Sequence, residues 1–298
     1  MTMRVVRPGA PSHLRVAGDP ATIVTTALVG AVERLMLHDA EIRRGTDDPE
    51  AIHDARVAVR QIRSHAASLS SVLDVDAIAP EVEQLGTFAR ALGDVRDLDV
   101  FLEDLAAETA NVPEAIRAEA ARIASSVALE RGVAFDRLRR SMEAAKHTHL
   151  LMTLMSIAVD PPLRQPTQAP DPAVVMSSVW KALSRRAGAA GGSSTDPVLH
   201  EVRTRAKRVR YTAEALAPFV GDRASAFAKS AARLQDVLGR HQDSAIAIDK
   251  LSAVAVTDPD LAFAAGWLAA GRERIRVETR AAWPDAWRSL AKKKRRFW

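Results

Sequence analysis

The sequence contains no cysteine among its 298 residues. This absence excludes disulfide frameworks, thiol nucleophiles, cysteine-ligated zinc and iron–sulfur clusters. Aromatic residues make up only 4% of the chain. No run of residues reaches the roughly 18 uncharged apolar positions typical of a membrane helix, and residues 1–10 lack the apolar stretch of a secretory signal. We therefore expect a cytoplasmic protein that does not enter a membrane.

Sequence motifs of common phosphate and hydrolase chemistry are also missing. The chain has no GxxxxGK[ST] loop and no GxSxG elbow, and its glycine-rich segment 188–195 has no lysine to reach a phosphate. His200 and Glu201 begin like a zincin motif that lacks its second histidine. His147 and His149 are two positions apart, which places them on different faces of a helix. We predict no catalytic residue, no metal site and no cofactor.

The charge of the chain is close to balanced. Its 42 basic and 37 acidic residues give a formal net charge of +5, and the run from Lys292 to Arg296 supplies that excess alone. An anionic partner must therefore be argued from clusters rather than from the total. Most of the basic residues are arginines, whose planar guanidinium suits bidentate contact with phosphate.

Helical periodicity covers nearly the whole chain, and no alternating strand pattern stands out. We expect helices at 20–44, 49–73, 80–107, 113–142, 173–187, 197–218, 222–254 and 259–283. Five prolines between residues 159 and 172 exclude a helix there and indicate a linker. The apolar segment 147–158 is too short to span a membrane and suits a core or interface helix. The predicted organisation is a flexible N-terminus (1–18), a first four-helix bundle (19–158), the linker (159–172), a second four-helix bundle (173–290) and a solvated basic tail (291–298).

Two blocks of sequence recur in the same order. IHDARVAVRQIR at 52–63 aligns with LHEVRTRAKRVR at 199–210, and both read apolar-His-acid-x-Arg-x-x-x-basic-x-x-Arg. LGDVRD at 92–97 aligns in the same way with LGRHQD at 238–243. Two matched blocks in the same order favour an internal duplication.

Each first block sorts into faces when it is placed on a helix at about 100° per residue. Ile52, Ala55, Val59 and Ile62 share a core face, as do Leu199, Val202, Ala206 and Val209. A second face is cationic or titratable in both blocks, and we call these faces the basic stripes. They consist of His53, Arg56, Arg60 and Arg63 in the first block and of His200, Arg203, Lys207 and Arg210 in the second.

Like charges along one helix face cost stability, by a few tenths of a kcal/mol per pair. Their recurrence therefore favours a polyanion site, in which arginine contacts phosphate and histidine adds a donor when protonated. The alternative is that carboxylates such as Asp97 and Asp243 pair with the stripes inside the fold. A further open alternative is a cation site at the acidic residues Asp94, Asp97, Asp99, Glu103 and Asp104, although solvated carboxylates near a helix start are commoner.

The two pairs of blocks, with the terminal RRFW, resemble the CHAD family of helical domains over about residues 20–298. The resemblance implies an all-α fold of two four-helix bundles, related by a pseudo-two-fold axis, with a shared basic groove or central pore. It also implies non-catalytic binding of inorganic polyphosphate, often at polyphosphate granules. Carried over, the residues of both basic stripes become the phosphate contacts, Arg96, Arg240 and His241 are additions on the third helices, and Asp97 and Asp243 orient arginine side chains. The second LG block departs from the first, which puts the third-helix contacts in question.

Two other functions stay open. Nucleic acid offers phosphates too, but base recognition needs aromatic side chains among the basic groups, and Tyr211 is the sole aromatic residue next to either stripe. A protein-interaction adaptor would show exposed apolar stripes, whereas the apolar faces found here are accounted for by bundle cores. The oligomeric state is not predicted.

Overall fold

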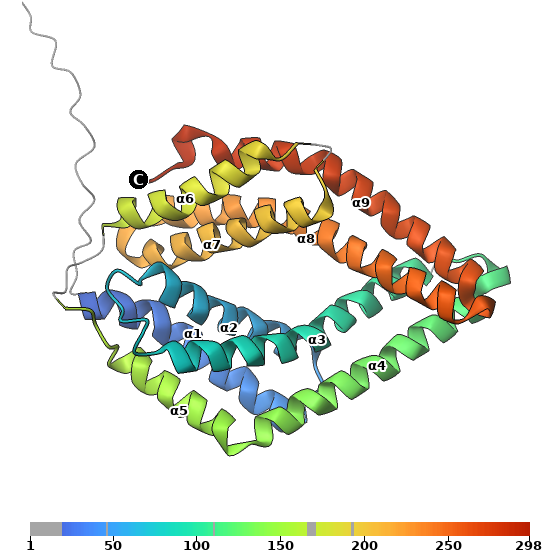
Figure 1. Ribbon diagram of the computed structural model, residues 1–298, viewed down its shortest axis with the longest axis horizontal. Coiled ribbons are helices and arrows are strands. Elements are labelled where there is room, and N and C mark those ends of the chain that lie inside the picture. Colours follow the sequence, from blue (N-terminus) through green and yellow to red (C-terminus); the bar gives the residue numbers. More distant parts are fainter. Residues whose placement is uncertain (1–19, 46, 110, 166–170, 192–193) are drawn as a thin grey trace, which may run out of the picture.

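The computed structural model describes residues 20–45, 47–109, 111–165, 171–191 and 194–298. These residues form nine α-helices and no extended strand (Figure 1). The helices are α1 Pro20–Arg43, α2 Pro49–Ser68, α3 Ala79–Thr109, α4 Arg117–Glu143, α5 Ala145–Val159, α6 Pro172–Ala189, α7 Asp196–Val220, α8 Asp222–Thr257 and α9 Ala262–Ala291. The all-α class is therefore confirmed. The expected N-terminus 1–18 lies outside the described residues, as do 166–170 of the linker.

The helix expected at 147–158 adds a fifth helix to the four-helix bundle predicted for the first half of the chain. Helix α4 ends where Ala144 adopts an extended backbone (φ −68°, ψ 137°), and the chain continues at once as α5. Leu150, Leu151 and Leu154 of α5 are buried in the core that α1 and α2 also build. The segment 147–158 is thus a core helix, and it covers a side of α1 that four helices would leave exposed.

Helix α9 continues past Pro284, where the sequence predicted an end at 283. A proline inside a helix removes one backbone hydrogen bond. Trp283 and Leu290 are both buried in the same core on either side of this proline. Their burial holds the last turns of α9 in place.

Three hydrophobic cores organise the molecule. The first joins α1, α2 and α5 with the beginning of α3 and the end of α4. The second joins α6 and α7 with the beginning of α8 and the end of α9. The third is built where the other ends of α3, α4, α8 and α9 meet. The long helices α3 and α8 therefore each leave a core of their own and converge at the shared third core (Figure 1).

The two halves also contact each other directly. Helix α2 lies beside α7, and the hydroxyls of Ser68 and Thr212 are hydrogen-bonded at 2.7 Å. At the third core, the buried Arg272 of α9 pairs with Asp104 and Glu108 of α3, at 2.7 Å in each case. The two halves of the molecule are thus joined in two places, where α2 contacts α7 and at the third core (Figure 1).

Residues 295–298 of the basic tail pack against the second core, whereas Lys292, Lys293 and Lys294 are exposed as expected. Phe297 is 3% exposed and contacts the ring of Phe227. Arg295 donates to the hydroxyl of Ser230 at 2.8 Å, and the guanidinium of Arg296 stacks over Trp180. The expectation of a solvated tail rested on its run of charges, whereas Phe297 and Trp298 supply apolar area that packs against the second core.

Helix α1 is long and apolar enough to cross a membrane by length and composition. The same composition suits a core helix or a signal sequence. In this fold Ile23, Leu28, Val32 and Leu35 are buried in the first core.

Candidate anion-binding site

The two basic stripes lie on α2 and α7, the helices that pack side by side. Helix α2 begins at Pro49, and Asp48 caps it with a side chain that accepts a hydrogen bond from the backbone N–H of Glu50. The predicted core faces are confirmed, because every residue assigned to them in both blocks is 4% exposed or less. This burial fixes the rotation of each helix and turns its basic stripe away from its own core.

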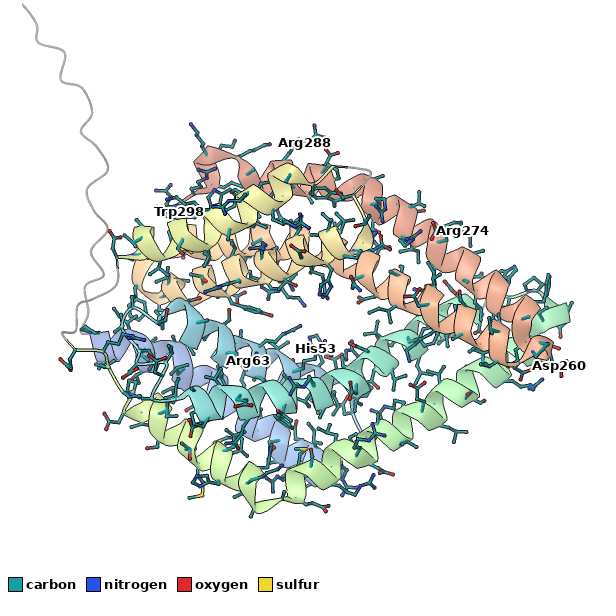
Figure 2. The ribbon with its side chains drawn as sticks, in the orientation of Figure 1. His53, Arg63, Asp260, Arg274, Arg288 and Trp298 are labelled. Carbon is teal, nitrogen blue, oxygen red and sulfur yellow. The ribbon has the colours of Figure 1, made fainter. Side chains whose placement is uncertain are left out.

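Corresponding positions of the two stripes come close to each other. Arg56 and Arg60 of α2 lie within electrostatic reach of Arg203 and Lys207 of α7. Arg56 is near Arg203, and Ser68 further along α2 contacts Thr212 further along α7, so the two helices run in the same direction. His53 and Arg63, labelled in Figure 2, mark the ends of the stripe on α2. The stripes thus meet in one cationic cluster, which we define as Arg56, Arg60, Arg203 and Lys207.

The cluster is poorly neutralised from within the described part of the chain. Arg60, Arg203 and Lys207 form no ion pair there, and the buried Nε atoms of Arg60 and Arg203 have no hydrogen-bond acceptor. Burial, followed by the charges of Arg203, Arg60 and Arg56, lowers the pKa of Lys207 to about 7. The fold therefore holds cations together where they destabilise each other.

Glycines on the neighbouring helices make room for these side chains. A Cβ at Gly93 of α3 would lie 2.9 Å from Nη1 of Arg56, and a Cβ at Gly239 of α8 would lie 3.6 Å from Nε of Arg203. Both glycines belong to the recurring LG blocks. The missing side chains let α3 and α8 approach closely enough to support the first arginine of each stripe.

Of the two aspartates beside the cluster, Asp97 is hydrogen-bonded to an arginine and Asp243 is not. Arg56 donates to Asp97 at 3.0 Å, with Asp97 itself half exposed. Asp243 faces Arg203 and Lys207 without a hydrogen bond to either, and burial raises its pKa, against the lowering effect of Arg203. Asp97 is thus in contact with a stripe arginine, whereas Asp243 acts on the cluster through its charge.

The outer members of the stripes have distinct surroundings. Arg63 is exposed and packs its guanidinium over Gly86. Arg210 donates to Glu214 at 2.7 Å and lies 5.5 Å from the centre of the Tyr211 ring. Burial, followed by the charges of Arg96 and Arg60, lowers the pKa of His53.

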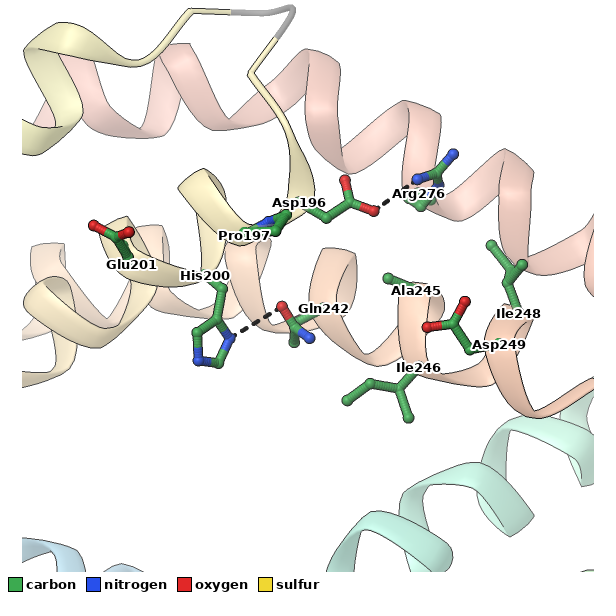
Figure 3. A pocket seen from close by; sticks show the side chains of 10 residues that line it. All are labelled: Asp196, Pro197, His200, Glu201, Gln242, Ala245, Ile246, Ile248, Asp249 and Arg276. Carbon is green, nitrogen blue, oxygen red and sulfur yellow. Dashed lines mark hydrogen bonds and ion pairs between the residues drawn. The ribbon is translucent and has the colours of Figure 1, made fainter.

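His200 is exposed, and its Nδ1 is 3.1 Å from the amide oxygen of Gln242 (Figure 3). Both residues line a cavity of about 620 Å³ between α7, α8 and α9. Asp196 and Arg276, which are joined by an ion pair at 2.7 Å, form another wall of this cavity. The cavity extends from the end of the basic stripe toward acidic and apolar residues, so it is not a continuation of the cationic surface.

The three expected contacts on the third helices differ in position. Arg96 lies near His53 and donates to Glu103 at 2.8 Å. Arg240 is exposed and acts electrostatically on Asp104. His241 is 1% exposed and sits 3.4 Å from Asp196, on the side of α8 that faces α9. A group buried there does not reach a ligand on the stripes, so we do not retain His241 as a contact.

The acidic residues of α3 are divided among different partners. Asp99 pairs with the buried Arg131 of α4 at 2.8 Å, Glu103 with Arg96, and Asp104 with Arg272. Across the described residues, no group of three or more histidine or carboxylate side chains is arranged to hold a metal ion. The acidic segment therefore braces the helices.

Comparison with known proteins places the chain among related sequences and folds. The profile of the CHAD domain family matches residues 26–252. Two structures are similar: PptA from Streptomyces chartreusis (TM-score 0.75, 18% identity, covering 90% of this chain and 99% of that one) and the CHAD domain from the plant Ricinus communis (TM-score 0.74, 21% identity, 95% and 97%). At these identities the likeness shows the fold.

Two curated relatives come from Mycobacterium tuberculosis, the uncharacterized proteins MT2285 (strain CDC 1551 / Oshkosh) and Rv2226 (strain ATCC 25618 / H37Rv). Each is 29% identical over 240 residues, which is 78% of this chain and 45% of the relative. The chain thus spans less than half the length of the curated relatives that it matches.

Proposed function

The chain belongs to the CHAD domain family, and we propose that it binds inorganic polyphosphate without catalysing a reaction. One observation carries the proposal: Arg60 and Lys207 approach each other from α2 and α7, and within the described residues neither forms an ion pair or a hydrogen bond with a carboxylate. A polymer of phosphates brings acceptors at regular intervals and would neutralise the cluster along its length. Family membership supports polyphosphate-related binding, and the cluster supports this location for it.

In the proposed complex, the arginines of both stripes make charge-assisted hydrogen bonds to phosphoryl oxygens. Each stripe spans roughly 15 Å of helix, enough for several consecutive phosphates. Arg96 and Arg240 extend the contacts toward the third core. Asp97 holds the guanidinium of Arg56 in place through their 3.0 Å hydrogen bond, and Asp243 balances part of the charge of Arg203.

The proposal includes an internal duplication that gives two bundles sharing one basic groove. Its support is the repetition of a three-residue arrangement on separate helices. Arg56 lies over Gly93 and beside Asp97, while Arg203 lies over Gly239 and within reach of Asp243. In each half the arginine comes from the first recurring block, and the glycine and aspartate from the second.

Nucleic acid is the less favoured ligand. Single-stranded nucleic acids are held largely by stacking of bases on exposed aromatic rings. Tyr211, the one aromatic residue beside the stripes, is 3% exposed and offers no such platform. Inorganic polyphosphate has no bases, so it loses nothing at a surface without aromatic rings.

A role in protein interaction is a second candidate, on the evidence of α5. Met152, Met155 and Val159 follow one another at helical spacing and are 68%, 41% and 69% exposed. An exposed apolar stripe of this kind is typical of a contact surface. It is compatible with polyphosphate binding elsewhere on the molecule, and we place the protein in the cytoplasm, at polyphosphate granules when the polymer is stored.

The test is a pair of titrations of the protein, with long-chain polyphosphate and with single-stranded DNA, each at two salt concentrations. Tighter binding of polyphosphate that resists added salt supports a dedicated site. Equal affinities that collapse together with salt would contradict it and leave a generic basic surface. The matched variants are Lys207→Ala at the cluster and Lys229→Ala at an exposed position of α8.

A further inference from the structure

Lys207 differs from the other groups of the cationic cluster because its charge depends on pH. It lies one helical turn after Arg203 on α7, and Arg56 and Arg60 approach it from α2. Among the described residues, Asp243 of α8 is the carboxylate that acts on it appreciably. Lys207 is half-buried and forms no ion pair in the described part of the chain.

These surroundings favour the neutral amine, which is the nucleophilic form. With a pKa lowered to about 7, about half of the Lys207 side chains are neutral at that pH. An ordinary lysine has roughly one neutral amine in 2,500 at pH 7. Desolvation next to other cations is a known way of activating a lysine for attack on a carbonyl carbon.

The same surroundings would also bind the phosphoryl end of a small molecule. Guanidinium groups of Arg56, Arg60 and Arg203 offer donors for a phosphate dianion, and two of them have buried Nε atoms without an acceptor. A molecule that carries a reactive carbonyl next to its phosphate would therefore be held with that carbonyl near the amine.

We propose that Lys207 is a site of covalent acylation by acyl phosphates, whose phosphoryl group is held by the arginines of the cluster. The amine lone pair of Lys207 forms a bond to the acyl carbon, and the bond from that carbon to the phosphate oxygen breaks. The amine proton passes to the departing phosphate, which leaves as hydrogen phosphate, so the products are an amide and inorganic phosphate. No oxidant, reductant or metal takes part.

Acylation of Lys207 would regulate polyphosphate binding, and this consequence rests on the proposed function. Acylation removes one charge from the centre of the cluster and weakens its hold on a polyanion. Conversely, bound polymer would occupy the arginines, exclude acyl phosphates from the cluster and so protect Lys207 from acylation.

Acetyl phosphate is the probe for the experiment. The full chain is incubated with it at pH 7, and acetylation of each lysine is followed over time by mass spectrometry of peptides. We expect Lys207 to react about ten-fold faster than the exposed Lys229, since its larger neutral fraction outweighs its lower access. A rate at Lys207 equal to or below that at Lys229 would overturn the proposal.

An uncharged acetylating ester, used in parallel, separates the reactive amine from the phosphate guidance. The preference for Lys207 over Lys229 should be several-fold larger with acetyl phosphate than with the ester, and Arg60→Ala should reduce this difference. Equal preferences with both reagents would contradict guidance by the arginines.

The outcomes also distinguish this inference from the proposed function. Selective acetylation of Lys207 that added polyphosphate does not slow would contradict the polymer site while leaving the modification intact. Tight polyphosphate binding without selective acetylation would remove the modification alone.

Discussion

The cluster makes a quantitative prediction about the pH dependence of polyphosphate binding. The pKa of Lys207 is lowered to about 7 in the free protein, because burial and three nearby arginines disfavour its charged form. A bound polyanion reverses this effect and returns the pKa toward the ordinary value of about 10.4. The protein binds tightly only when Lys207 is protonated, so the apparent affinity scales with the protonated fraction.

The magnitude follows from that fraction. Between pH 7 and pH 9 the protonated share of free Lys207 falls from about one half to about one in a hundred, so polyphosphate affinity should fall roughly 50-fold. The sign is that of a proton taken up on binding: affinity is close to full at about pH 6, one unit below the free-state pKa, and is lost as the pH rises through that pKa.

The assay is a fluorescence titration with polyphosphate at half-unit steps of pH and constant ionic strength. Lys207→Arg is the matched control, because it keeps the positive charge and does not titrate in this range. We expect its affinity to be nearly flat from pH 7 to pH 9. Identical pH slopes for the wild-type protein and Lys207→Arg would refute the reasoning.

Three other predictions concern single residues. Gly93→Ala should weaken polyphosphate binding several-fold with little change in unfolding temperature, since the added Cβ displaces only the end of the Arg56 side chain. The control is Gly132→Ala, where a Cβ meets open space. This variant should stabilise the protein by about 0.5–1 kcal/mol in urea unfolding and leave the polyphosphate affinity unchanged. Burial lowers the pKa of His65 in the folded protein to about 4. As the pH falls below about 6.5, His65 is protonated in the unfolded chain before it is protonated in the folded protein, so the free energy of unfolding should decrease. A His65→Leu variant whose stability in urea unfolding has the same pH slope would contradict this. Burial and nearby arginines also lower the pKa of His53, so its contribution to binding should grow only as the pH falls below the ordinary histidine value of about 6.5, and His53→Gln should remove that gain in a titration of affinity against pH.

Much of the helical framework and the stripes could be predicted because they depend on local spacing. Proline and polar breaks mark where helices begin, and the positions of Ile52, Val59, Leu199 and Val209 fix which face is buried. Once the core face is fixed, the position of the arc that carries the basic stripe follows from helix geometry alone. That the two stripes share one groove was implied by the resemblance to the CHAD family, since periodicity does not say which helices pack together.

Other features depend on long-range packing and were not predicted from spacing. The sequence suggested a core or interface helix at 147–158 but not its packing against α1, and α9 passes Pro284 because Trp283 and Leu290 are both buried. His241 was assigned by its residue type, although the alignment of the two LG blocks sets it against Val95, which is fully buried. The alignment was the better guide.

The glycines of the LG blocks were visible in the sequence, but their role was not. Gly93 and Gly239 matter because of what lies above them on another helix. Two recurring glycines at the same place in a repeat are a signal of close approach between helices, and they point to the supporting side of the site.

The central claim is that cations from α2 and α7 hold one polyphosphate chain together, and the salt dependence of binding tests it most directly. Polyphosphate affinity would be measured across a series of salt concentrations for the wild-type protein, Arg60→Ala, Lys207→Ala, the double variant and Arg137→Ala, whose side chain is exposed on α4. Each change in the cluster should weaken binding and flatten the slope of log affinity against log salt by about one, while Arg137→Ala leaves both unchanged. Slopes and affinities that stay at the wild-type value in both cluster variants would place the polymer elsewhere and contradict the account.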